Sequence, residues 1–97
     1  MTMAAYLIAD ITVQNPEVFA EYRKQVPATV EKYGGRYLAR GGAHESLEGD
    51  WRPSRVIVLE FPDMAAAKAW YGSQEYGPLI KLRQSASTGP VILVEGA

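Results

Sequence analysis

The order of strand-like and helix-like segments constrains this chain more than any other feature of its sequence. Four short apolar or extended segments are predicted strands: residues 6–13, 36–40, 55–61 and 91–95. Two helical segments separate them, one after the first strand and one after the third. The order β-α-β-β-α-β, with an extra short helix before the last strand, predicts an α+β ferredoxin-like sandwich.

Capping residues mark the ends of both predicted helices. Asn15 precedes a proline and is a good N-cap, and Gly34 suits the left-handed position after the helix end. Pro27 should kink this helix or divide it. Asp63 caps the second helix, which we expect over residues 64–71.

The remaining segments are less regular. Pro78 should begin one or two helical turns, and residues 85–90 should form a turn region. Residues 44–50 are polar and predict either a loop or a weak edge strand. With 97 residues, the chain is expected to form a single domain over positions 1–97.

Composition excludes several classes of function. The chain has no cysteine and a single histidine, His44, so thiol catalysis, cysteine–zinc sites and sites needing two histidines per chain are excluded. A net charge of −1 argues against nucleic-acid binding. No apolar run approaches a membrane span, and no basic segment precedes the first apolar stretch. We expect a cytoplasmic protein without metal or cofactor, binding neither nucleic acid nor membrane.

One face of the predicted sheet has no helix to cover it. Strand 6–13 would expose either the set Tyr6, Ile8 and Asp10 or the set Leu7, Ala9 and Ile11. Either choice leaves large apolar groups in water, and such patches usually mark an interface. The pattern therefore predicts a homodimer that packs through its sheet faces.

Four stretches, in the same order, carry a family resemblance: EKYGGRYLARGG (31–42), LEGDW (47–51), VLEFPD (58–63) and AWYGSQEY (69–76). From about residue 6 to residue 96 the chain resembles the domain-of-unknown-function family 1330. That family is similar to the dimeric α/β-barrel superfamily, in which two ferredoxin-like sheets pair face to face. Members of the superfamily include cofactor-independent oxygenases, isomerases, haem-binding enzymes and small proteins of no known activity. The resemblance therefore implies a dimeric α/β barrel and no particular reaction.

Three side chains are candidates for acid–base catalysis. Glu60 interrupts an apolar strand, so it either lines a cavity as a proton acceptor or is paired with Arg40, Arg55 or Arg83. Asp10 could approach Glu60 if both face the cavity, or could meet water or an arginine near its strand end. His44, in a polar loop, is either a proton carrier or a solvated side chain.

Four further side chains are candidates for ligand binding. If Arg40 or Arg83 faces the cavity, the ligand is expected to be an anion. The alternative is pairing with Glu48, Glu60 or Glu75. Tyr76 lies in an irregular segment and is predicted to form a pocket wall, and Trp51 is a second aromatic candidate. Trp70, at helical spacing, is predicted to lie in the core.

Two functions fit these candidates, and a third needs no pocket. The first is a cofactor-independent enzyme acting on a small aromatic or carboxylic metabolite by proton transfer. The second is a non-catalytic protein that binds or senses a small molecule in the same pocket. The third is an interaction role with the dimer face as its only functional surface.

Overall fold

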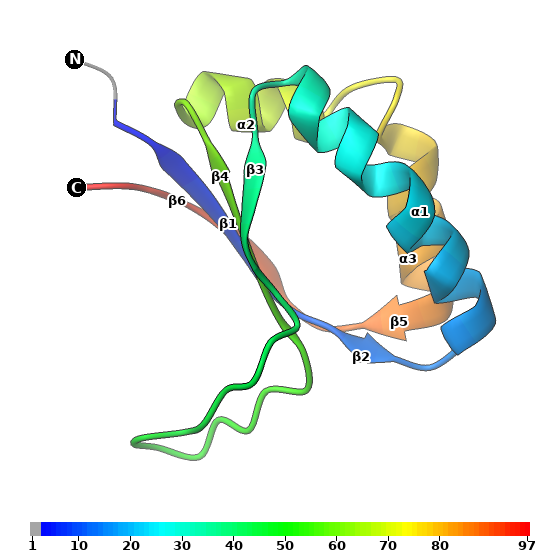
Figure 1. Ribbon diagram of the computed structural model, residues 1–97, viewed down its shortest axis with the longest axis vertical. Helices are drawn as coiled ribbons and strands as arrows, with labels where there is room; N and C mark the ends of the chain where they lie inside the picture. Colours follow the sequence, from blue (N-terminus) through cyan, green and yellow to red (C-terminus); the bar gives the residue numbers. More distant parts are fainter. Residues whose placement is uncertain (1–2) are drawn as a thin grey trace.

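A four-stranded antiparallel sheet forms one layer of the molecule, and three helices cover one of its faces (Figure 1). The computed structural model describes residues 3–97. The strand order is β3-β4-β1-β6, where β1 is Ala5–Asp10, β3 Arg36–Arg40, β4 Val56–Phe61 and β6 Val91–Glu95. This order confirms the ferredoxin-like fold.

The helices are α1 (Pro16–Lys32), α2 (Met64–Tyr71) and α3 (Gly77–Ala86). The predicted caps are confirmed: the Asn15 side chain accepts a hydrogen bond from the Val18 N–H, and Asp63 accepts one from the Ala66 N–H. Gly34 follows α1 with a φ of +80°, the left-handed conformation expected there. α1 runs through Pro27 without dividing.

Three elements differ from the prediction. The expected strand 6–13 is two strands, because the chain leaves the main sheet after Asp10 and forms β2 (Thr12–Val13) in a second sheet. β2 pairs with β5 (Ser87–Thr88), which lies where only a turn was expected. The short helical segment from Pro78 is a ten-residue helix, α3, so its length was underestimated.

The hydrophobic core lies between the sheet and the helices. The face of β1 that carries Leu7 and Ala9 is buried against them, which decides between the two alternatives left open by the sequence. Phe61 and Trp70 are almost fully buried and their rings meet at 5.2 Å, which confirms Trp70 as a core residue. No helix within residues 3–97 is long and apolar enough to cross a membrane.

The opposite, outer face of the sheet is apolar and uncovered. On it Leu38, Ile92 and Val94 are 48%, 56% and 42% exposed. Tyr6 and Ile8 of β1 and Val58 of β4 are partly exposed between these two edge strands. A contiguous apolar area of this kind is typical of an interaction surface.

The loop joining β3 to β4, residues 41–55, projects away from the sheet and helices, and we call it the arm (Figure 1). Leu47 in the arm is 85% exposed. The segment 44–50 contains no strand, so of the two predicted alternatives the loop is the observed one.

Gly35→Ala should destabilise the protein by about 1–3 kcal/mol, the usual cost of overpacking a core. A Cβ at Gly35 would lie 2.6 Å from Phe61 Cε1 and 2.8 Å from Val30 Cγ1, and both side chains are fully buried. Gly42→Ala is the matched control, since a Cβ there meets nothing within 4 Å. Urea unfolding measures both; equal midpoints for the two variants would contradict the prediction.

Candidate functional site

A β-bulge in β3 places Arg40 on the same face as Tyr37, toward the helices. Tyr37 pairs with Leu59 and Arg40 with Ile57, and the register shifts between Tyr37 and Ala39. Leu59 and Ile57 are two residues apart on one strand and therefore share a face, so Tyr37 and Arg40 share it too. The guanidinium carbon of Arg40 lies 4.5 Å from the centre of the Tyr37 ring, within the range of a cation–π interaction.

Pro27 contributes a hydrogen-bond acceptor to the same region. A proline inside a helix has no N–H, so the carbonyl four residues earlier, here that of Arg23, loses its helical donor. Arg40 Nη2 donates to the carbonyl oxygen of Arg23 at 3.4 Å. The guanidinium of Arg40 thus spans from the sheet to α1.

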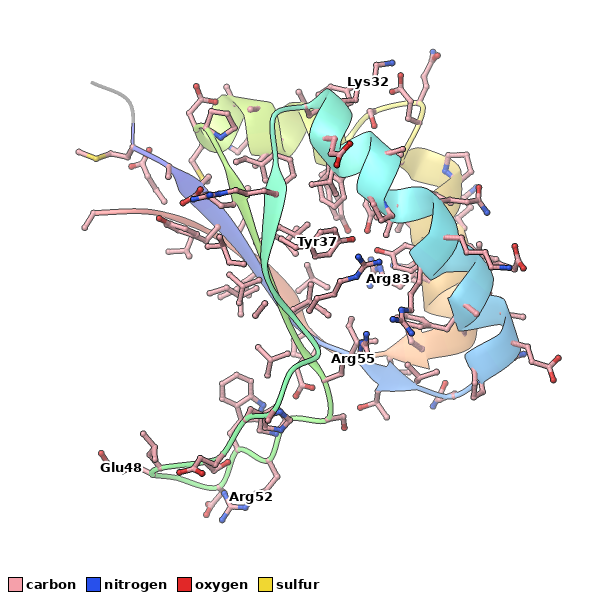
Figure 2. The ribbon with its side chains drawn as sticks, viewed as in Figure 1. Lys32, Tyr37, Glu48, Arg52, Arg55 and Arg83 are labelled. Carbon is pink, nitrogen blue, oxygen red and sulfur yellow. The ribbon has the colours of Figure 1, made fainter. Side chains whose placement is uncertain are left out.

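A pocket lies between the inner face of the sheet and the helices α1 and α3. The space between its atoms is about 550 Å³, including the part that opens to solvent. Nonpolar side chains form most of its wall. Its remaining side chains are four arginines and three tyrosines: Arg23, Arg40, Arg55, Arg83, Tyr22, Tyr37 and Tyr76. Figure 2 shows Tyr37, Arg55 and Arg83 pointing into the region between the sheet and these helices.

The positive charge of this pocket is not neutralised by the protein. No aspartate, glutamate or histidine lines it among residues 3–97. The ion pairs found in that part of the chain are Lys24–Glu21, Lys32–Glu75 and Arg36–Glu60, none of which includes a pocket arginine. The Nε atoms of Arg55 and Arg83 are buried without a hydrogen-bond partner, and Arg83 is only 7% exposed.

Burial and like charge both act on Arg55. Loss of solvent lowers its pKa, and the positive charges of Arg23 and Arg40 lower it further. Gly41, with a φ of +73°, is packed against the guanidinium: a Cβ there would lie 2.6 Å from its central carbon. Because a side chain at Gly41 would collide with this group, the glycine leaves room for Arg55 to enter the pocket.

A pair of tyrosine hydroxyls forms another part of the pocket. The hydroxyl oxygens of Tyr22 and Tyr76 are 2.8 Å apart, and the Tyr76 ring stacks on Trp70 with centroids 3.9 Å apart. Burial raises the pKa of both tyrosines, so both hydroxyls keep their protons at neutral pH. Burial also raises the pKa of Tyr37.

The structure divides the predicted site residues into two groups. Arg40, Tyr76 and Arg83 line the pocket, and neither arginine pairs with Glu48, Glu60 or Glu75 as the alternative interpretation expected. The other four do not line it: Glu60, Asp10, His44 and Trp51.

Glu60 lies on the outer face of the sheet. Its carboxylate accepts a hydrogen bond from Arg36 Nε at 2.8 Å, and the two residues are directly opposite on β4 and β3. The partners expected from the sequence were Arg40, Arg55 or Arg83, which was wrong because those side chains lie across the sheet. Asp10 and Glu60 do not meet either, since they lie four positions apart along the pairing, or about 13 Å.

Asp10 fixes the base of the arm. Its carboxylate accepts hydrogen bonds from Trp51 Nε1 at 2.9 Å and from the backbone N–H groups of Ser54 and Arg55 at 2.9 and 3.4 Å. The Trp51 bond and the two backbone bonds hold the pKa of Asp10 below its usual value. His44 is part of the arm as well, where its Nε2 donates to the Pro53 carbonyl at 2.8 Å.

Sequence reasoning missed four members of the pocket. Tyr22, Arg23 and Tyr37 received no role in a site, and Arg55 was expected only as a possible partner of Glu60. Pro27 was the signal in the sequence that could have been used. A proline at this position leaves the Arg23 carbonyl without its helical donor, which indicates a free hydrogen-bond acceptor on that side of the helix. Within residues 3–97, no three side chains of metal-binding type gather at one point.

These features define an α+β domain of the ferredoxin-like class with a cationic pocket between sheet and helices. The chain belongs to the family DUF1330, a domain of unknown function that matches residues 4–97. This confirms the family expected from the sequence motifs. A comparison with curated proteins finds no match.

Solved structures share the fold at low sequence identity. The RPA0582 protein of unknown function from Rhodopseudomonas palustris has a TM-score of 0.81 at 19% identity, over 100% of this chain and 85% of the other. SnoaB, a cofactor-independent oxygenase from Streptomyces nogalater, has a TM-score of 0.68 at 14% identity, over 99% and 95%. Rv0793 from Mycobacterium tuberculosis has a TM-score of 0.53 at 20% identity, over 97% and 93%. At these identities the similarity establishes the fold alone.

Asp10→Ala should loosen the base of the arm. The variant removes the acceptor of three hydrogen bonds, so the Ser54 and Arg55 amides should exchange their protons at least about tenfold faster, as expected for losing a bond to a charged group. Asp50→Ala, elsewhere in the exposed arm, is the control and should leave these amides unchanged. Hydrogen exchange followed by NMR measures this, and unchanged protection in Asp10→Ala would contradict the anchoring role.

Proposed function

We propose that this protein binds a small, largely apolar anion in the pocket between its sheet and helices. The observation that carries the proposal is the set of four arginines in an otherwise apolar wall, with no acidic residue lining it within residues 3–97. Guanidinium groups recognise carboxylates and related oxyanions through paired, charge-assisted hydrogen bonds. The apolar wall favours a ligand whose body is a ring or a short hydrocarbon.

The energetics of the free pocket support this assignment. A buried polar atom without a partner costs about 1–3 kcal/mol, and more when it is charged. Arg55 and Arg83 each hold one such atom, and the pocket arginines also repel one another. An anion would relieve both costs at once, so the pocket is poised for a negatively charged ligand.

Binding without chemistry is the function this geometry supports best. Proton transfer by Glu60, Asp10 or His44 would need a ligand on the outer face or at the arm, because these side chains do not line the pocket. Arginine and neutral tyrosine are poor proton acceptors at neutral pH. The proposal is thus the small-molecule binding alternative, for a protein we expect in the cytoplasm.

A second candidate is a cofactor-independent reaction of the bound anion. It is favoured by the fold shared with SnoaB, which is described as a cofactor-independent oxygenase, and by the cationic pocket, which would stabilise an enolate or phenolate form of a substrate. Oxygen uptake or product formation from a bound ligand would support this candidate, whereas unchanged ligand after prolonged incubation supports binding alone.

Arg55→Met should abolish anion binding without weakening the fold. Benzoate at ten times its dissociation constant should stabilise the wild type by roughly 1.4 kcal/mol, or about 6–11 °C in melting temperature. In Arg55→Met this shift should disappear, while the free protein keeps or gains stability because a partly buried charge that Arg23 and Arg40 repel is removed.

Two controls sharpen this test. Arg52→Met changes an arginine at the far end of the arm and should leave the benzoate shift intact (Figure 2). Benzamide has the shape of benzoate without its charge and should give no shift with any variant. A benzoate shift that survives in Arg55→Met, or equal shifts from benzoate and benzamide, would overturn the assignment.

We also propose that the chain acts as one domain and forms a homodimer through the outer face of its sheet. The exposed apolar side chains of that face support this proposal, with Leu38 on one edge strand and Ile92 and Val94 on the other. A homodimer would remove this surface from water while leaving the pocket on the opposite side of each sheet.

Ile92→Lys should convert the dimer into a monomer. A lysine at this exposed position places an unpaired charge in the proposed interface, at a cost that exceeds the gain from burial. Gln84→Lys, on the exposed side of α3, is the control. Size-exclusion chromatography with light scattering at micromolar concentration should give two 10.7 kDa chains for wild type and control, and one for Ile92→Lys. A monomeric wild type would refute the dimer.

A further inference from the structure

The polar groups of the pocket form two sets in different places. Arg40 is the last residue of β3 and Arg55 the last residue of the arm, directly before β4, and Arg23 on α1 is close enough to act on Arg55. The second set, Tyr22, Tyr76 and Arg83, joins α1 to α3. Tyr37 lies between them: Arg40 stacks on its ring, and Tyr76 is close enough to raise its pKa.

The tyrosine set is rigid. Tyr76 is 2% exposed, and its ring is stacked against Trp70, whose indole N–H donates to the Thr29 hydroxyl at 3.0 Å. Tyr22 is held by the Phe19 ring at 5.5 Å between centroids. The two hydroxyls therefore occupy fixed positions rather than adapting to any ligand.

This set has more donors than acceptors. Two hydroxyls carry two protons, and the bond between them uses only one. Within residues 3–97, no other protein oxygen accepts a hydrogen bond from either hydroxyl. Arg83, which lies beside Tyr76, is also a donor, and its Nε is without a partner. With one hydroxyl proton and the Arg83 Nε–H free, a ligand group that accepts hydrogen bonds fits here best.

We propose that the ligand carries two oxygen functions at opposite ends of a flat apolar body. Its anionic group is held by Arg23, Arg40 and Arg55, and a carbonyl or comparable acceptor oxygen binds the Tyr22–Tyr76 pair and Arg83. The ligand class is therefore a ring-containing or similarly compact carboxylic acid with an oxo group. An ammonium group at the second end is disfavoured, since it would lie beside the positive charge of Arg83. This inference rests on the anion-binding function proposed above.

Matched ligand pairs test the second oxygen directly. The probes are 3- and 4-acetylbenzoate, each compared with the isopropylbenzoate of the same substitution, which has nearly the same shape but no acceptor. Calorimetric titration of the wild-type chain should show one acetyl compound binding about tenfold more tightly than its isopropyl partner, since a site built for a hydrogen bond discriminates against ligands that lack it.

Variants assign this preference to the tyrosines. Tyr22→Phe should reduce this preference to less than threefold. Arg40→Met should weaken both members of a pair by the same factor. Tyr71→Phe is the control, because Tyr71 is a partly exposed tyrosine near the same aromatic cluster that does not line this pocket.

The outcomes separate this inference from the function on which it rests. If acetyl- and isopropylbenzoates bind equally at both positions, or the preference survives in Tyr22→Phe, the second oxygen site is refuted and the anion site stands. If none of the four carboxylates binds, both proposals fail. The comparison of ligands on the wild-type chain decides this even if a variant does not fold.

Discussion

A single layer of helices on one side of the sheet is the constraint on which the other features depend. The helices α1, α2 and α3 bury one face and leave the apolar outer face to water (Figure 1). On the covered face, α2 packs over Phe61 through Trp70, whereas α1 and α3 meet the sheet across the pocket. Long arginine and tyrosine side chains reach into that region from both layers, so it is closed by polar tips rather than by aliphatic packing.

Arginine is suited to this position because its side chain is amphipathic. Its apolar stem can cover apolar neighbours while its guanidinium group meets a cavity, and Arg40 and Arg83 both line this pocket. Leucine or methionine would fill the same volume without the cost of burying a charge. A fold that places the partly buried Arg55 and the buried Arg83 beside one cavity gives up stability, as is typical of sites maintained for a ligand.

The elements that sequence reasoning predicted correctly are those fixed by neighbouring residues. Asn15 and Asp63 cap helices through bonds to residues three positions later, and Gly34 adopts its left-handed conformation locally. α3 was underestimated because Gly77 and Pro78 are typical of a turn, although they also suit the start of a helix.

The site was harder to predict because it depends on pairing between strands. Strict alternation places Arg36, Leu38 and Arg40 on one face, and only the bulge between Tyr37 and Ala39 moves Arg40 to the inner face. Likewise, alternation places Glu60 with Val56 and Val58, but it cannot show which face the helices cover. The packing of the helices therefore decides that Glu60 faces away from the pocket. The register between β3 and β4 decides that its partner is Arg36.

Separation of charge maintains the cationic character of the pocket. The acids that could have neutralised its arginines are engaged elsewhere: Glu60 with Arg36, Asp10 with Trp51 and the base of the arm, and Glu75 with Lys32 and Tyr33. The Lys32 bond, with that from the Tyr33 hydroxyl, lowers the pKa of Glu75 to about 2, so this carboxylate stays ionised and bound far below neutral pH. Since a cavity lined by charges of one sign raises the local concentration of the opposite ion, the same separation that leaves Arg55 and Arg83 without partners also draws an anion toward them.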